Sequence, residues 1–446
     1  MYTAPTTVAT KYTEMDRKRW LLRYIILIVV GIVLVLKVYS LLFIDYVVGI
    51  YSVLTTCVLF SYLFFAYIKY RDPYLDAQSI AIDKTSGTIP FVSIIIAVKN
   101  EEHNIQDCVH SCLNSTYANK EVIVIDDGST DRTSEILDKM KNESNIRIIH
   151  LLENVGKKKA IEAATHVAKG EFFIFTDSDC QIASDAVEKA VKIFQNDKTI
   201  GAIAGHIRER DVKSGNALRK LLDVRLDGSC RIIKGMESYF SSITCCSGPL
   251  SAYRREAVEP FIHPWANDRF LGKEFRFSTD RRLTAYVLNA KPLLTGNSGF
   301  FWKLKYSQSM VVFCREPETF RALIKQRIRW QKSFIRSIFA TGTIYWKRPF
   351  LAALTYYLQI SLRIIRPYII LKSLFLLPFM GDYITPIFYI SGVLFSGMIY
   401  GIDFRLRNPT SGLQWLYRPL LQLITIYVLS WLIIYAAITI KKMSWR

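Results

Sequence analysis

The stretch EFFIFTDSD at residues 171–179 decides the fold class of this chain, because it joins a strand pattern to two closely spaced carboxylates. The residues from Phe172 to Thr176 are aromatic or β-branched, which is typical of a β-strand buried on both faces. Asp177 and Asp179 follow at once. Ligands of parallel sheets bind beyond the carboxyl ends of the strands. The stretch therefore predicts a strand that ends at a ligand site.

The sequence around this stretch alternates short apolar runs with amphipathic runs. This alternation predicts an α/β fold with a parallel sheet and right-handed crossovers. The expected strands lie at 91–98 (FVSIIIAV), 121–125 (EVIVI), 146–151 and 171–176, and helical patterns begin near Glu101, Asp131 and Gly156. The second of these strands stops at Asp126 and Asp127, so that two acidic strand ends are expected at one edge of the sheet.

Apolar residues gather at the two ends of the 446-residue chain, which is 51% hydrophobic. Several of these segments are about as long as a helix that crosses a bilayer. We expect spans at 20–44 and 46–68 before the α/β region, and at 352–379, 383–402 and 420–440 after it. The first is not read as a cleaved signal peptide, because no small-residue cleavage site follows it and a second span comes directly after.

The formal net charge of +20 is consistent with nucleic acid, an anionic membrane surface or an anionic substrate as partner. The basic clusters stand beside the apolar segments, as in Arg17–Arg19 and Lys69–Arg71. That placement favours membrane lipids over nucleic acid and puts both flanks of the first two spans in the cytoplasm.

Five full crossings would leave Lys441 and Lys442 outside the cell, against this charge rule. One C-terminal segment is therefore expected to be interfacial or re-entrant. Arg363 and Arg366 interrupt the segment at 352–379, and Pro419 marks a plausible break near the last one. The eight cysteines lack paired metal-ligand spacing, which favours reduced thiols over a zinc site or a disulfide framework.

The two acidic strand ends are candidates for binding a nucleotide. Asp177 and Asp179 could share one divalent cation with a bound diphosphate, although a solvated turn would also use such residues. Asp126 and Asp127 could accept hydrogen bonds from a uracil or a ribose, and an ordinary Asp-Gly turn is the alternative. Lys157 follows Gly156 at an expected helix N-terminus, where it could hold a phosphate, whereas its neighbours Lys158 and Lys159 could equally form a solvated basic face.

Two later motifs could act on an acceptor. Asp280 could take the proton from an attacking hydroxyl as a general base, although an Asp followed by two Arg is often a surface ion pair. Gln326, Arg329 and Trp330 lie on one face of an expected helix and offer an amide, a cation for phosphate and an aromatic platform for a sugar. An interfacial amphipathic helix would use the same residues.

Together these motifs resemble those of the processive family 2 glycosyltransferases, which include cellulose, chitin and hyaluronan synthases. Three segments are similar to bacterial hyaluronan synthases in particular, and the resemblance extends over nearly the whole chain. They are Cys246–Glu256 (CSGPLSAYRRE), Phe270–Gly272 (FLG) with Asp280–Thr284 (DRRLT), and Gln326–Phe334 (QRIRWQKSF).

The resemblance implies a GT-A-like, Rossmann-like domain that inverts the anomeric centre and uses UDP-sugars with Mg2+ or Mn2+. Asp126, Asp127 and Lys157 would contact UDP, with Glu101 near the uridine. Asp177 and Asp179 would hold the metal on the diphosphate, and Asp280 would be the base. The Ser247–Gly248–Pro249 turn, with Gln326, Arg329 and Trp330, would bind the acceptor and the diphosphate.

Two features of the chain depart from the hyaluronan synthase pattern. Those enzymes usually read G-D-D-R where this chain has Ser278-Thr279-Asp280-Arg281, so the second Asp is kept and the first is lost. Their W-G-T motif is reduced here to Ser444-Trp445-Arg446. Donor closure, product length and the identity of the sugars could differ as a result.

The expected organisation is an integral protein of the plasma membrane with a cytoplasmic catalytic domain. It comprises a tail at 1–19, two spans at 20–70, the glycosyltransferase domain at 71–336 and channel-forming helices at 337–446. The expected function is a processive synthase of hyaluronan from UDP-GlcNAc and UDP-GlcA, which passes the growing polysaccharide across the membrane. A chitin-like or other single-donor β-glycan synthase and a non-processive transferase to a lipid-linked acceptor are the alternatives.

Overall fold

The computed structural model describes residues 6–79, 89–212, 215–292 and 300–442. Its contacts divide the chain into two compact units. Unit 1 comprises Met1–Lys69 and Thr355–Trp431, and unit 2 comprises Tyr70–Leu354 and Leu432–Arg446. The W-G-T-like stub at 444–446 lies outside the described residues.

Unit 2 contains the α/β region that the sequence predicts. Its strands are β1 (Val92–Val98), β2 (Lys120–Asp126), β3 (Ile146–His150), β4 (Phe172–Asp177), β5 (Cys180–Ile182), β6 (Ile200–Glu209), β7 (Ser251–Arg254), β8 (Arg269–Phe270), β9 (Lys273–Glu274) and β10 (Lys303–Cys314). Its helices are α3 (Pro73–Ala77), α4 (Ile105–Leu113), α5 (Thr133–Met140), α6 (Lys157–Val167), α7 (Ala186–Asn196), α8 (Ala217–Gly228), η2 (Ser229–Lys234), α9 (Gly235–Tyr239), α10 (Arg255–Ala266), α11 (Thr279–Asn289), α12 (Phe320–Thr341), η3 (Tyr345–Lys347) and α17 (Leu432–Ile438).

Eight of these strands form one mixed sheet in the order β3-β2-β1-β4-β7-β6-β10-β5. The four strands that the sequence predicts, β3, β2, β1 and β4, are its parallel part. β7 lies antiparallel between β4 and β6, and β5 is antiparallel to β10. The expected parallel sheet is thus one half of a mixed sheet, because the turn at 247–250 brings the chain back against β4.

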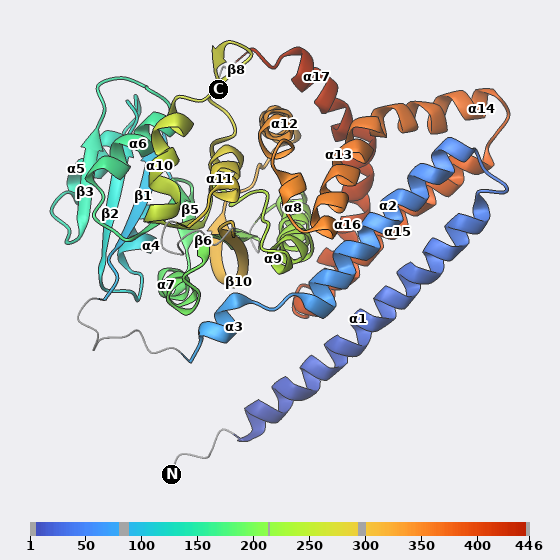
Figure 1. Cartoon of the computed structure of the whole chain (residues 1–446), viewed down its shortest axis with the longest axis horizontal. Helices are drawn as coiled ribbons and strands as arrows, with labels where there is room; N and C mark the ends of the chain where they lie inside the picture. The colour runs from blue at the N-terminus through green and yellow to red at the C-terminus, as the bar shows by residue number, and fades with distance from the viewer. Residues whose placement is uncertain (1–5, 80–88, 213–214, 293–299, 443–446) are drawn as a thin grey trace. The chain divides into compact units, whose positions relative to one another are not determined.

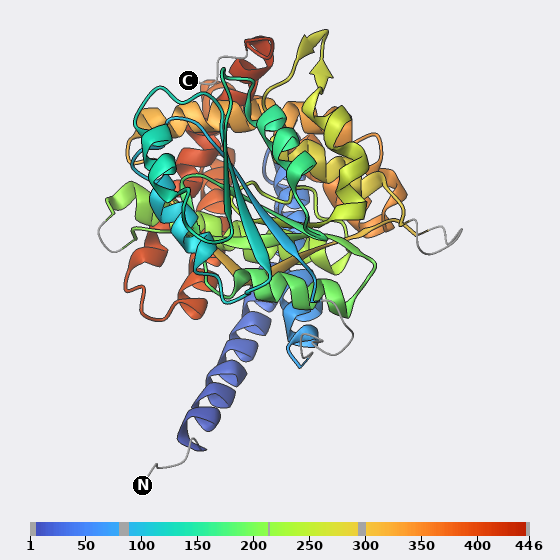
Figure 2. The same ribbon diagram turned by 90° about the vertical axis from the view of Figure 1, so that its left-hand side faces the viewer.

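Helices cover the parallel half of the sheet, which explains its unbroken apolar strands. Ile94, Ile95 and Ile96 of β1 are at most 1% exposed, and burying each such side chain stabilises the fold by roughly 1.5–3 kcal/mol. α6 packs against β1, β2 and α10, while α4 packs against α5. Because such crossovers are right-handed, the change of direction after β3 places α6 on the face opposite α4 and α5. Figures 1 and 2 show helices beside the sheet of this unit.

The change of direction also fixes where the site lies. β1 is flanked by β2 and β4, and the register pairs Val98 with Asp126 and Ala97 with Asp177. The two acidic strand ends therefore stand on either side of the carboxyl end of β1. This is the position at which ligands of doubly wound sheets bind.

Unit 1 is built from apolar helices, some of them interrupted by tighter or wider turns. They are α1 (Thr6–Ser40), α2 (Tyr46–Phe64), η1 (Phe65–Lys69), α13 (Phe350–Leu371, in this unit from Thr355), η4 (Lys372–Leu376), α14 (Leu377–Phe379), α15 (Ile384–Arg407), η5 (Gln414–Leu416), α16 (Tyr417–Leu423), η6 (Ile424–Val428) and η7 (Leu429–Trp431). In the described chain, four helical segments are long and apolar enough to cross a membrane: Trp20–Ser40, Tyr46–Ala77, Ile384–Arg407 and Gln414–Ile438.

α13 is not among these four segments, yet two of its side chains contact α2, in the order expected for antiparallel helices. Tyr62 donates to Gln359 at 2.6 Å near one end of α2, and Arg366 donates to the hydroxyl of Tyr51 at 3.1 Å further along. Beyond α13, Lys372 pairs with Asp45 at 2.8 Å, at the α1–α2 connection. Of the two arginines that interrupt this segment in the sequence, Arg366 thus has a polar partner on α2.

The last apolar segment of unit 1 changes its helix type several times. Pro419 lies in the first turn of α16, where its missing N–H leaves no helical hydrogen bond unmade, so it does not break that helix. The α-helix instead gives way to a π-helical turn at Ile424–Val428 and a 3-10 turn at Leu429–Trp431. The change of geometry therefore comes after the position that the sequence suggested.

Candidate active site

Asp177 and Asp179 lie together at the end of β4. Their carboxylate oxygens and the Cys180 thiol are all within 4.8 Å of one another, and both carboxylates are partly exposed. Burial and the neighbouring charge of Asp177 raise the pKa of Asp179 to about 6. Two carboxylates held this close repel each other unless a cation lies between them. Their oxygens are the ligands that Mg2+ and Mn2+ prefer, so the pair fits a divalent metal.

Lys157 provides the positive charge nearest to this pair. It is the first residue of α6 and forms an ion pair with Asp177. Burial lowers its pKa, but the charges of Asp177, Asp179 and Asp280 outweigh this effect and raise it. Its ammonium group therefore stays charged and faces three site carboxylates. Of its neighbours, Lys158 is 5% exposed and donates to the carbonyl of Phe275 at 2.8 Å, so only Lys159 belongs to an exposed basic face.

Asp127 determines how the chain enters α6. Its carboxylate accepts hydrogen bonds from the backbone N–H groups of Val155 at 2.7 Å and Gly156 at 3.0 Å. Burial raises its pKa despite these two bonds. The next residue, Gly128, has φ 65°, and a Cβ there would lie 3.0 Å from the backbone of Asn154. The structure thus ties the end of β2 to the loop that presents Lys157.

The other two residues expected at the nucleotide, Asp126 and Glu101, lie next to that loop. The carboxylate of Asp126 is 2% exposed and accepts hydrogen bonds from Ser129, Ser134 and His150. Burial works to raise its pKa, but these bonds outweigh burial and lower it. The backbone N–H of Glu101 donates to the Thr133 hydroxyl at 2.9 Å. Contact of either residue with UDP stays a prediction.

The Ser247–Gly248–Pro249 turn lies directly against Asp177. A Cβ on Gly248 would stand 3.0 Å from both carboxylate oxygens of Asp177, so a larger residue would crowd the metal candidate. The carbonyl of Pro249 accepts a hydrogen bond from Thr176 at 2.8 Å, which fixes the turn to the end of β4. Ser247 accepts a hydrogen bond from Lys234 at 2.8 Å.

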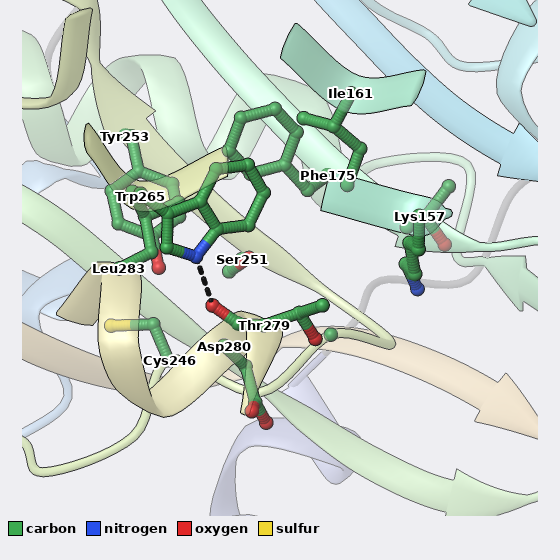
Figure 3. Close-up of a pocket in the computed structure, with 12 residues that line it drawn as sticks. Lys157, Ile161, Phe175, Cys246, Ser251, Tyr253, Trp265, Thr279, Asp280 and Leu283 are labelled. Atoms are coloured by element: carbon green, nitrogen blue, oxygen red, sulfur yellow. Dashed lines mark hydrogen bonds between the residues drawn. The ribbon is translucent and has the colours of Figure 1, made fainter. Parts of the chain in front are cut away.

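Asp280 lies in the first turn of α11 and lines a partly open cavity in unit 2 (Figure 3). The charged ends of Lys157 and Asp280 lie apart from the rings of Phe175, Tyr253 and Trp265 in this view. The indole N–H of Trp265 donates to the carbonyl of Thr279 at 2.7 Å and so anchors the start of α11. The full lining is Lys157, Ile161, Phe175, Thr176, Cys246, Gly248, Ser251, Tyr253, Trp265, Thr279, Asp280 and Leu283.

This cavity brings together three residues that the sequence predicts for different roles, namely Lys157, Gly248 and Asp280. Of its aromatic residues, Trp265 matches no motif, and Tyr253 lies within the Cys246–Glu256 segment, where the sequence assigned it no role of its own. The arrangement offers a cation, a carboxylate and apolar ring surfaces around one space. Tyr253 and Trp265 are each 1% exposed, so their rings form a buried base for the cavity, while Lys157 and Asp280 are the polar groups that could meet the hydroxyls of a sugar.

Gln326, Arg329 and Trp330 lie on α12 of the same unit, outside the described lining of this cavity. Trp330 is 40% exposed, and its ring is approached by the guanidinium groups of Arg327 at 4.1 Å and Arg225 at 5.5 Å. The predicted sugar platform therefore contacts two cations in this structure. Its binding of acceptor or diphosphate stays a prediction.

A buried charge cluster that the sequence did not reveal connects the helices around the site. Asp268 is paired with three cations: Lys158 of α6 at 3.5 Å, Arg282 of α11 at 3.2 Å and Arg336 of α12 at 2.7 Å. Arg282 thus pairs with Asp268. It does not form the surface ion pair with Asp280 that the sequence left open. No local pattern links these residues, since they come from four segments of the chain.

A comparison with protein families identifies the domain that contains these strand ends, the carboxylate pair and the lysine. The sequence model described as glycosyl transferase family 2 matches residues 93–261. The chain contains a family 2 glycosyltransferase domain. Its match covers β1 to most of α10 and includes Asp126, Lys157, Asp177 and the 247–249 turn.

Curated relatives extend the similarity beyond this glycosyltransferase domain. The chain is 27% identical to the hyaluronan synthase of Streptococcus pyogenes over 361 residues, which cover 79% of this chain and 82% of the relative. It is 30% identical to an N-acetylglucosaminyltransferase of Rhizobium meliloti over 292 residues, with 64% of this chain and 65% of the relative covered. The protein is a glycosyltransferase related to both groups.

A solved structure shows the same fold. A mannosyltransferase from Pyrobaculum calidifontis in complex with GDP-Man and Mn2+ superposes with a TM-score of 0.52 at 19% identity, and covers 89% of this chain and 99% of its own. The GT-A-like architecture expected for the glycosyltransferase domain is therefore confirmed.

Proposed function

We propose that this glycosyltransferase is a processive, inverting synthase that builds hyaluronan from UDP-GlcNAc and UDP-GlcA. The observation that carries the proposal is the cavity shared by Lys157, Gly248 and Asp280 beside the Asp177–Asp179 pair. The similarity to a hyaluronan synthase over 79% of the chain supports the choice of sugars.

In the proposed reaction, a hydroxyl oxygen of the acceptor sugar attacks the anomeric carbon of the donor from the side opposite the diphosphate. The new C–O bond forms as the bond between the anomeric carbon and the phosphate oxygen breaks, and UDP leaves with that electron pair. The carboxylate of Asp280 takes the hydroxyl proton. Attack from the opposite side inverts the anomeric centre and gives a β-linkage.

The chain's own residues would position the donor for this step. Asp177 and Asp179 would hold Mg2+ or Mn2+, which when bound offsets negative charge on the diphosphate. Lys157 would add a fixed positive charge on the side of Asp177. Gly248 leaves room beside Asp177 for a phosphate or sugar oxygen. Trp265 would hold the start of α11, and with it Asp280, through its hydrogen bond to the Thr279 carbonyl.

We further propose that the catalytic domain lies in the cytoplasm at the plasma membrane, where UDP-sugars are available. The apolar helices of unit 1 would carry the growing chain outward. Their polar contacts, such as Tyr62 with Gln359 and Arg366 with Tyr51, give hydroxyl and amide groups to an otherwise apolar unit. A polysaccharide needs such hydrogen-bonding groups on its way through a membrane.

A single-donor β-glycan synthase is the second candidate, because the chain is 30% identical to an N-acetylglucosaminyltransferase. The chemistry at Asp177, Asp179 and Asp280 would be the same. A non-processive transferase to a lipid-linked acceptor would also need the metal pair, but it would leave the motif on α12 without a purpose.

The test is a radiolabelled assay on the purified protein in lipid vesicles with Mg2+ or Mn2+. UDP-GlcNAc and UDP-GlcA are supplied singly and together, and products are sized before and after hyaluronidase. A large, hyaluronidase-sensitive product that requires both donors is expected. Polymer from one donor would move the assignment to the second candidate, and label in a lipid fraction alone would contradict polymer synthesis.

A further inference from the structure

The thiol of Cys245 contacts the carboxylate that the proposed mechanism uses as a base. Its Sγ lies 3.1 Å from Oδ2 of Asp280, a hydrogen-bond distance at which the thiol donates and the carboxylate accepts. The other oxygen of that carboxylate, Oδ1, accepts from the backbone N–H of Arg281 at 2.8 Å. Both oxygens of Asp280 are therefore held by one protein donor each.

The same segment is joined to α11 a second time, one residue further on. The backbone N–H of Cys246 donates to the Thr284 hydroxyl at 2.9 Å, and that hydroxyl donates to the carbonyl of Asp280 at 2.7 Å. Cys245 and Cys246 immediately precede the Ser247–Pro249 turn, so these contacts connect the turn beside Asp177 to the helix of the base. The thiol is the part of this connection that touches the carboxylate itself.

We propose that Cys245 is a positioning residue that orients the carboxylate of Asp280 toward the cavity. The inference rests on the proposed role of Asp280 as base. By donating to Oδ2, the thiol fixes the rotation of the carboxylate and stabilises its ionised form, which is the form that takes a proton. Cys245 is not among the described residues that line the cavity, so it acts through Asp280 and not on the sugar.

The protonation state of Cys245 suits this role. Burial, and next the negative charge of Asp280, raise its pKa well above the usual value, so the thiol keeps its proton over the working pH range. A thiolate in this place would repel the carboxylate and could not donate. Among the described residues, the charged or titratable groups that act on Asp280, on Cys245 or on their neighbour Tyr253 include Lys157, Lys234, Arg281, Cys246 and Tyr253 itself.

The experiment compares full-length variants in lipid vesicles, with UDP-GlcNAc and UDP-GlcA as donors and the pH dependence of kcat as readout. Cys245→Val keeps the volume and removes the donor, whereas Cys245→Ser restores a donor. In Cys245→Val, kcat falls about three- to tenfold and the acid limb of the pH profile moves up by about 0.5–1 pH unit, because one hydrogen bond to the ionised carboxylate is lost. The KM for each donor stays unchanged. Cys245→Ser recovers most of kcat and of the pH profile, and Cys57→Val in α2 is the matched control that leaves both unchanged.

A second measurement reports the hydrogen bond without turnover. In difference infrared spectra, the S–H stretching band that Cys245→Val removes lies at lower frequency than a free thiol, and Asp280→Asn shifts it upward. The inference is overturned by an S–H band that Asp280→Asn does not move, or by an unchanged pH profile in Cys245→Val. In either case, loss of activity in Asp280→Asn leaves the proposed function standing. Full activity of Asp280→Asn would instead overturn the assignment of the base, and the inference with it.

Discussion

Ser278 has a backbone conformation that glycine adopts more easily than any other residue. Its φ is 63°, it is 5% exposed, and its hydroxyl has no hydrogen-bond partner among the described residues. It stands where the G-D-D-R pattern of hyaluronan synthases has glycine, at the N-cap of α11, two residues before Asp280. A glycine at this position of the present chain would adopt the same conformation without strain.

We therefore expect Ser278→Gly to stabilise the protein. Relief of the left-handed strain (about 1–2 kcal/mol) and loss of a buried, unpaired hydroxyl outweigh the backbone entropy of glycine (about 0.5–1 kcal/mol), for a net gain of about 1 kcal/mol. Thermal unfolding in detergent measures the change as a rise in apparent Tm. Ser184→Gly, at an exposed position with ordinary φ, is the control and lowers Tm slightly. A lower Tm for Ser278→Gly would contradict the strain.

Asp179 should make metal binding sensitive to acid. Its pKa is raised by burial and by Asp177, so it takes up a proton at a pH where an ordinary Asp is still ionised. A proton and a divalent cation compete for the same oxygens, so Mn2+ affinity falls as the pH drops through about 6 and is regained above it. Titration of Mn2+ by electron paramagnetic resonance at several pH values measures this. Asp179→Asn should bind Mn2+ weakly at every pH, and an affinity that stays constant from pH 7 to 5 would contradict the prediction.

At the scale of elements, Asp268 holds together the three helices that carry the site. α6 presents Lys157, α11 presents Asp280 and α12 carries the Gln326–Trp330 motif, and each sends one cation to the same carboxylate. Asp268 itself is 5% exposed. One negative charge thus compensates three positive ones in a region with little access to water.

Asp268→Asn should therefore be strongly destabilising. The substitution leaves three neighbouring cations without a counter-charge, and breaking a buried ion pair in this way costs about 3–5 kcal/mol. Chemical denaturation followed by tryptophan fluorescence measures the loss. Glu259→Gln, which removes an exposed pair with Arg255, is the control and changes stability by less than about 1 kcal/mol. The double variant Asp268→Asn with Arg336→Met recovers part of the loss, and an unaffected single variant would contradict the cluster's role.

The same elements show what the sequence could and could not predict. β1 to β4 were predicted to within about one residue at most ends, because buried parallel strands give continuous apolar runs bounded by turn residues. The acidic ends of β2 and β4 could be placed at one edge because parallel strands share their direction. β7 has four residues and no distinctive pattern, so its antiparallel insertion was not predicted.

Contacts between distant segments were out of reach for the same reason. The fit of Gly248 against Asp177 depends on a backbone approach across 71 positions that no local pattern encodes. The spacing of Gln326, Arg329 and Trp330 indicated a common helix face, but not that Arg225 of α8 contacts that face. Cys245 could be read as an ordinary thiol until the structure placed it at Asp280.

At the scale of the whole molecule, the contacts within unit 1 bear on the number of membrane crossings. Asp45, at the α1–α2 connection, pairs with Lys372, and its backbone N–H donates to Thr385 at the start of α15. Near the other end of α2, the guanidinium of Arg407 lies 6.0 Å from the ring of Tyr67. The segment from Thr355 to Phe379 therefore leads from one end of α2 to the other, and α15 leads back. If this segment crosses the bilayer, as α1, α2 and α15 are long and apolar enough to do, the connection at 408–413 lies on the side where α1 begins.

This arrangement predicts the side from which introduced cysteines react with a membrane-impermeant maleimide in sealed vesicles. Leu42→Cys and Met380→Cys, both at exposed positions of one end, should react from the outside. Leu413→Cys, at the other end, should react only from the inside, together with Leu152→Cys in the glycosyltransferase domain. The protein without an added cysteine gives the background, because six of its eight thiols are buried. Labelling of Met380→Cys from the inside would mean that α13 does not cross. Arg363 and Arg366 of α13 would then lie at the membrane surface and would not line a polar path through the bilayer.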